Sequence, residues 1–147
     1  MRRVAALLLA AASCFAGTPV ISQGKLDNWV ARWRHVLQLD DWDIKAKTVR
    51  LADLPEGDAA FSETVVQLQM LRIYVLDPRD YAAMAKRDGE APKTSRAILR
   101  DIEDSVIHEM VHLRVRPFKL ASIAQMDAAE ELLVDRLTTA LLKARKR

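Results

Sequence analysis

Residues 108–112 read His-Glu-Met-Val-His, the pattern H-E-x-x-H, inside an apolar run. On an α-helix, His108 and His112 are one turn apart and project from the same face. Two imidazoles held in this way suit two corners of a tetrahedral zinc site. Glu109 follows the first histidine and can reach the open corner, where a carboxylate would take a proton from bound water. Of everything in the sequence, this motif most constrains the fold, because it requires a helix that presents one face to a metal.

A catalytic zinc site needs a third protein ligand, and the C-terminal segment offers one. Glu131 and Asp135 are four residues apart, so both lie on one face of a helix. We expect Glu131 to bind the metal and Asp135 to accept the far ring N–H of a zinc-bound histidine. Glu130 points about 100° away on an ideal helix, so we expect it to be solvated and keep it as the alternative ligand. The stripe by which this helix should pack is apolar and comprises residues 132, 133, 137, 141 and 142.

The two motifs together resemble those of the gluzincins, the thermolysin-like metallopeptidases. There H-E-x-x-H on one helix is followed by E-x-x-x-D on the next, and here the two pieces are HEMVH at 108–112 and ELLVD at 131–135. The run EELLVDRLTTALL is also similar to the second motif of small ImmA/IrrE-type and phage-associated metallopeptidases. The segments LDDWDIKAK at 39–47 and LRIYVLD at 71–77 resemble the front half of the small phage-type members. The resemblance spans roughly residues 26–142, and the two metal motifs are its specific part.

This resemblance implies a minimal zincin-like domain and a zinc-dependent metallopeptidase that acts on a peptide or protein. His108, His112 and Glu131 would hold Zn²⁺, Glu109 would be the general base, and Asp135 would orient a histidine. The alternative is a phage-derived zinc-binding domain with a partner-binding or regulatory role and little or no hydrolysis. Larger gluzincins also have Tyr, His or Arg residues that hold the tetrahedral intermediate. No motif identifies these here, and the candidates are the two tyrosines, Tyr74 and Tyr81.

Length and composition indicate one domain, which we place at residues 25–147 of the 147-residue chain. Apolar residues make up 50%, enough for a core, whereas aromatic residues make up 5%. So few aromatic side chains argue against a base-stacking platform, and we expect no nucleic-acid partner. The formal charge of +3 requires no acidic partner either. The third histidine, His35, lies outside the motif, and we interpret it as structural or exposed.

The N-terminal residues 1–16 read as a signal peptide, with a basic start, a short apolar run and small residues before a cleavage point at Gly17. Residues 17–24 would be a linker. This interpretation predicts a secreted or periplasmic protein with no transmembrane segment in the mature chain. Two alternatives stay open: lipid attachment at Cys14, or a cytoplasmic protein whose start codon is mis-chosen. Cys14 is the only cysteine, so cysteine usage does not decide the compartment.

The pattern of apolar residues predicts an α+β domain. Helical spacing indicates a helix at 25–38, the motif helix at 95–115, and a last helix at 128–145 capped by Asp127. Alternation indicates strands at 42–47, 59–66 and 67–76, followed by a short helix at 78–85. The three-stranded sheet should pack on the motif helix, and its outer strand should border a cleft to which an extended peptide can add.

Overall fold

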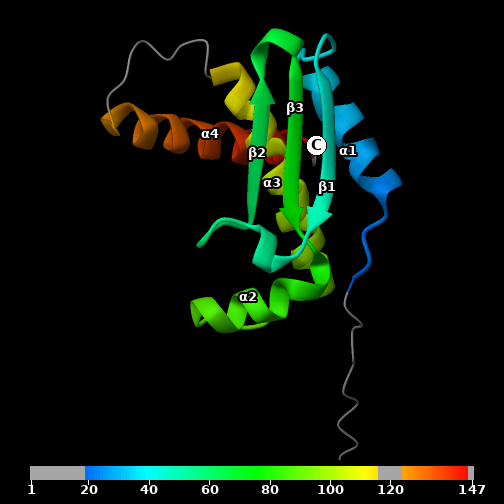
Figure 1. Cartoon of the computed structure of the whole chain (residues 1–147), viewed down its shortest axis with the longest axis vertical. Helices are drawn as coiled ribbons and strands as arrows, with labels where there is room; N and C mark the ends of the chain where they lie inside the picture. The colour runs from blue at the N-terminus through cyan, green and yellow to red at the C-terminus, as the bar shows by residue number, and fades with distance from the viewer. Residues whose placement is uncertain (1–18, 116–123, 146–147) are drawn as a thin grey trace, which may run out of the picture.

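The structure, a computed structural model, describes residues 19–115 and 124–145 (Figure 1). Its helices and strands follow one another in the order α1 (Gln23–Val36), β1 (Asp43–Val49), β2 (Ala60–Val65), β3 (Met70–Leu76), α2 (Tyr81–Asp88), α3 (Ser95–Val115) and α4 (Ala124–Ala144). Three 3₁₀ turns lie between them, at Leu51–Asp53, Val66–Leu68 and Pro78–Asp80. The predicted α+β class is confirmed, and the motif helix has the predicted bounds.

The sheet has the strand order β1-β3-β2, so the last strand in sequence is central. β3 runs parallel to β1 and antiparallel to β2. The predicted third strand began at residue 67, but β3 begins at Met70 because a 3₁₀ turn and Gln69 make the reversal from β2. Gln69 has φ +48, a left-handed conformation that lets the chain turn tightly. β2 is therefore an edge strand, and it lies next to β3 alone among the described strands.

One face of the sheet packs against α1 and α3, and none of the described helices covers the opposite face (Figure 1). Leu71, Ile73 and Val75 of the central strand are fully buried, whereas the alternating Arg72 and Tyr74 are half-exposed. This alternation is the period-2 pattern of a strand with one buried face. The side chains that meet this face are Leu26, Trp29, Val30 and Trp33 from α1, with Ile98, Ile102, Val106, Ile107, Met110 and Val111 from α3. α3 is thereby held against the sheet by its apolar side, and the polar side chains of the motif are not part of this packing.

α4 packs against α3 through a different face from the predicted one. Val134 and Thr138 are buried, whereas Leu132, Leu133 and Leu137 are 52%, 46% and 40% exposed. The predicted stripe is wrong at these three positions, although Leu141 and Leu142 do pack partly on the core. The sequence contains two overlapping helical stripes, and the buried stripe is the one whose polar members meet the histidines of α3. α4 also begins at Ala124, so Asp127 lies inside the helix and is not its N-cap.

The far end of α4 is held by a buried carboxylate. Glu103 of α3 accepts a hydrogen bond from Nε1 of Trp33 at 3.2 Å and forms ion pairs with Arg32 and Arg145. Arg32 and Trp33 belong to α1, and Arg145 directly follows the last residue of α4. Since a buried charge needs partners, this cluster ties both helices to α3 and thus fixes the direction of α4.

The first helix begins earlier than predicted. Ser22 caps it by accepting a hydrogen bond from the backbone N–H of Lys25, so the helix starts at Gln23, inside the predicted linker 17–24. The predicted signal peptide, 1–16, and Cys14 lie outside the described residues. Within residues 19–115 and 124–145, none of the helices combines the length and the apolar character needed to cross a bilayer.

Candidate metal centre

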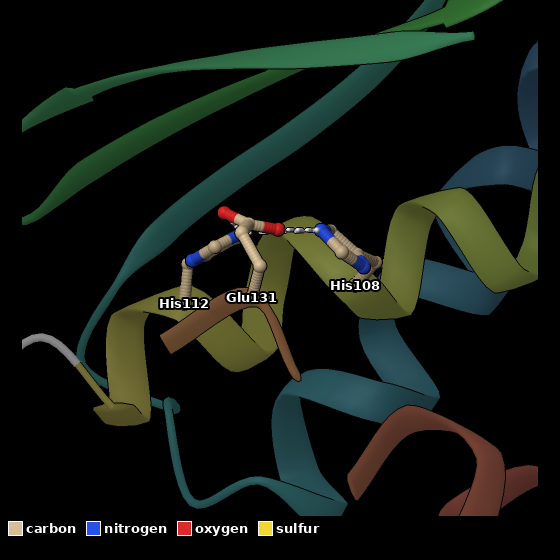
Figure 2. A group of neighbouring side chains, drawn as sticks. All are labelled: His108, His112 and Glu131. Atoms are coloured by element: carbon tan, nitrogen blue, oxygen red, sulfur yellow. Dashed lines mark hydrogen bonds and ion pairs between the residues drawn. The ribbon is translucent and has the colours of Figure 1, made fainter. Parts of the chain in front are cut away.

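α3 presents both motif histidines on the side that faces α4. The helix starts after Thr94, whose hydroxyl accepts a hydrogen bond from the N–H of Ala97. His108 and His112 then lie one turn apart, with side chains that are 25% and 9% exposed. Their Nε2 atoms are 3.1 Å apart and point toward a common position (Figure 2). The motif therefore forms the predicted pair of histidines on one helical face.

Glu131 of α4 reaches the same position from the other helix (Figure 2). One carboxylate oxygen lies 3.2 Å from Nε2 of His108, and the other lies 3.3 Å from Nε2 of His112. One ligand atom from each of the three residues lies within 4.8 Å of the others. The structure thus brings together the three side chains expected to bind the metal.

Both histidines have a carboxylate on the opposite ring nitrogen. Nδ1 of His108 lies 3.2 Å from Oδ1 of Asp135, and Nδ1 of His112 lies 2.9 Å from Oε1 of Glu130. An ionised carboxylate only accepts hydrogen bonds, so Nδ1 must be the donor and we assign the Nδ1–H tautomer to both rings. Each Nε2 is then left with a lone pair that faces the common position, as a histidine needs in order to bind a metal.

Glu130 is not solvated, and that expectation was wrong. Its side chain is 10% exposed and lies between the two helices. It shares the buried face of α4 with Val134 and Thr138, each four residues further on. Glu131 and Asp135 lie at the rim of this face, where they are 56% and 67% exposed. Glu130 therefore contacts Nδ1 of His112 as Asp135 contacts Nδ1 of His108.

The distances are compatible with a bound metal ion. Two ligand atoms about 2.0–2.1 Å from one ion at the tetrahedral angle lie roughly 3.3 Å apart. The two Nε2 atoms are 3.1 Å apart, Nε2 of His108 is 3.2 Å from Oε2 of Glu131, and Nε2 of His112 is 3.3 Å from the other oxygen, Oε1. Two Nε2 lone pairs and a carboxylate so close together repel one another unless a cation lies between them. The donor set of two imidazoles and one carboxylate suits zinc and leaves a fourth position for water or substrate.

Glu109 lies beside this centre and is held by the sheet. Its Oε2 atom is 2.5 Å from Oγ of Ser62, which belongs to the edge strand β2. Ser62 pairs with the buried Ile73, so its side chain is on the sheet face that covers α3. The serine donates to one carboxylate oxygen and leaves the other for a second partner. No sequence pattern indicated Ser62, because its contact with Glu109 depends on where the strand lies over the helix.

A cleft of about 510 Å³ opens next to His108 and Glu109. β2 and the residue before it form one wall, α3 forms the floor, and α4 forms the other wall. The lining side chains are Ala59, Ala60, Asp104, Ser105, His108, Glu109, Asp135, Thr138 and Thr139. Most of these side chains are small and fill little of the cleft. The size of the cleft is therefore determined by how far apart β2, α3 and α4 lie. The cleft is large enough for part of an extended peptide and is continuous with the candidate metal position.

The two tyrosines do not line this cleft. The hydroxyl of Tyr74 donates to Glu63 at 2.6 Å, on the sheet face that points away from α3. This hydrogen bond raises the pKa of Tyr74, with burial as a lesser cause. Tyr81 is buried in the core, and this burial raises its pKa. His35 is exposed and lies 3.5 Å from Asp40, which agrees with its interpretation as a residue outside the site.

Comparison of the chain with protein-family models, with curated protein sequences and with solved structures finds no match. The chemistry of the site itself is therefore what indicates a function.

Proposed function

We propose that this chain is a zinc-dependent metallopeptidase with a small zincin-like fold. One observation carries the proposal: His108, His112 and Glu131 converge from two helices, and each histidine has a carboxylate at its Nδ1 atom. A histidine pair that merely filled a polar surface would not need two orienting carboxylates and a third acid between the Nε2 atoms. Metal-binding histidines have this arrangement routinely.

A zinc ion held there would acidify a water molecule and polarise the carbonyl of the scissile bond. Glu109 is next to His108 and lines the cleft, so its carboxylate is placed to take the proton of the attacking water. The same carboxylate then delivers that proton to the amine that leaves. Ser62 restricts the carboxylate to one orientation through Oε2, which keeps Oε1 available for the proton.

The edge of β2 offers a place for the peptide backbone. The N–H of Leu76 donates to the carbonyl oxygen of Ala59 at 2.9 Å, so these residues form a hydrogen-bonded pair. Antiparallel pairing alternates, and the backbone groups of Ala60 and Ser62 therefore point away from β3. A substrate that adds to this edge as an extra strand would lie across the cleft, beside Glu109.

The deciding experiment compares the wild-type chain with Glu109→Gln. Zinc content is measured by elemental analysis of protein purified without chelator, and hydrolysis is measured on a mixed library of quenched fluorescent peptides. The amide fills the same space but cannot accept a proton, so both proteins should carry one zinc ion while the variant loses about 10²–10⁴-fold in rate.

The two measurements separate the alternatives. A wild-type chain that binds no zinc, even when zinc is added, contradicts the metal centre. A chain that binds zinc but cleaves no peptide in a Glu109-dependent way contradicts the peptidase and favours a binding or regulatory domain.

A further inference from the structure

The cleft beside the candidate metal centre is acidic on its α3 floor and on its α4 wall. Asp104 of α3 and Asp135 of α4 line it together with Glu109, and no lysine or arginine is among its lining residues in the described chain. Glu130 and Glu131 lie immediately behind it, against the histidines. Even with a divalent ion bound, the carboxylates of this region outnumber its positive charges. The surrounding field therefore favours a cation in the cleft.

Asp104 is the carboxylate in this group that has no direct polar partner among the described residues. Asp135 contacts His108, and Glu109 accepts from Ser62, whereas Asp104 forms no ion pair or hydrogen bond among the described residues. Burial and then the nearby Asp101 raise the pKa of Asp104, while His108 and Arg100 act in the opposite direction with smaller effect. A partly desolvated carboxylate of this kind is stabilised by a positive group that approaches it.

The α4 wall of the cleft adds a second polar group in need of a partner. Thr138 is 3% exposed and lines the cleft, and its hydroxyl has no hydrogen-bond partner in the described part of the chain. Buried hydroxyl groups are nearly always hydrogen-bonded. Among the described residues, this oxygen and the Asp104 carboxylate both lack a direct polar partner, and a protonated amine in the cleft can satisfy both.

We propose that this cleft is a specificity subsite for a positively charged group of the substrate next to the scissile bond. The inference rests on the proposed peptidase function and names its substrate class. The charged group is the side chain of lysine or arginine, or the amino terminus of the peptide, because both present a cation with N–H donors. The small lining residues leave room for a long side chain, and Asp104 on the floor and Asp135 on the α4 wall both line this space.

The test is peptide binding to zinc-loaded, full-length Glu109→Gln protein, which keeps the cleft and does not consume the peptide. Four sets of fluorescent hexapeptides are compared by anisotropy. Three sets are N-acetylated and carry lysine, norleucine or glutamate at each position in turn. The fourth set carries norleucine in the same way but has a free amino terminus. Norleucine has nearly the length of lysine without its charge. The lysine set and the set with a free amino terminus should bind about tenfold more tightly than acetylated norleucine. The glutamate set, which is negatively charged, should bind least. The lysine set identifies a side-chain subsite, and the free norleucine set identifies an amino-terminal one.

Asp104→Asn, added to the same protein, should abolish the preference for positively charged peptides. Asp27→Asn makes the same change of charge on α1, far from the cleft, and should leave the preference intact. The inference is overturned if positively charged and neutral peptides bind equally well. It is also overturned if the preference for positive charge survives in Asp104→Asn. Wild-type cleavage without charge preference would refute the subsite alone. Charge-selective binding without wild-type cleavage would refute the peptidase alone.

Discussion

Nδ1 of His112 lies 2.9 Å from Oε1 of Glu130, a residue whose side chain is 10% exposed between α3 and α4. This contact matches the one between His108 and Asp135 on the next turn. α4 therefore supplies one acid for the metal position, Glu131, and one acid behind each histidine. Three carboxylates within two turns of one helix organise both imidazoles.

Glu130→Ala should weaken zinc affinity by about 10–100-fold, because loss of a partner behind a metal-binding histidine typically has that effect. Glu131→Ala should be more severe, since it removes a ligand. Competition with a chromogenic chelator ranks the two variants. Glu56→Ala, in the exposed β1–β2 connection, is the control and should bind zinc as the wild type does. Unchanged affinity in Glu130→Ala would show that the contact with His112 does not support the metal.

The sequence predicted the parts of this site that depend on spacing within one helix. The His108 and His112 pair follows from i, i+4 geometry, and so does the shared face of Glu131 and Asp135. The α+β class and the bounds of α3 followed from the periodicity of the apolar residues. These features are local, and local rules determine them.

The features that the sequence did not predict depend on contacts between elements. The burial of Glu130 depends on which face α4 turns to α3, and two stripes competed for that position. Leucines at 132, 133 and 137 made the wrong stripe look apolar, whereas the true interface has the small Val134 and Thr138. Ser62 reaches Glu109 only because β2 is the edge strand over α3. Strand order and helix crossing cannot be read from residue spacing alone.

Ser62→Ala should lower kcat by about tenfold while zinc content stays at the wild-type level. The serine holds Glu109 through Oε2, and a carboxylate free to rotate is less often in the productive orientation. Ser62→Thr keeps the hydroxyl and suits a strand, so it should restore most of the rate. Steady-state kinetics beside elemental analysis provides the measurement. A rate equal to wild type in Ser62→Ala would mean that the contact does not position the base.

Acid should weaken the connection between β1 and α2 through Asp80. This carboxylate accepts two hydrogen bonds from Arg50, at 2.6 and 2.7 Å, and one from the N–H of Leu51 at 2.9 Å. The hydrogen bonds from Arg50 lower the pKa of Asp80 below its usual value of 3.8. The contribution is therefore fully present above about pH 4 and is lost as pH falls through the lowered folded-state pKa.

Asp80→Asn should reduce the free energy of unfolding at pH 7 by about 1–2 kcal/mol, since one partner, Arg50, is largely exposed. The variant should also lose less stability than the wild type on acidification from pH 4 to pH 2. Urea denaturation at a series of pH values, with chelator present, measures both effects. Parallel pH curves for the two proteins would contradict this role for Asp80.

Thr138→Val should increase the free energy of unfolding by about 1 kcal/mol. The hydroxyl of Thr138 is buried without a partner among the described residues, so its desolvation is uncompensated. Valine has nearly the same shape and no polar atom to desolvate. Thr139→Val, at the exposed neighbouring position, is the matched control and should change stability by less than about 0.5 kcal/mol.

The same Thr138→Val substitution removes a hydrogen-bond acceptor from the cleft, so it should also weaken binding of lysine-containing peptides. Denaturation and peptide anisotropy on one preparation would show whether stability rises while recognition falls, as expected when a buried polar group is kept for a ligand. A destabilised variant would instead mean that the hydroxyl already has a partner within the folded chain.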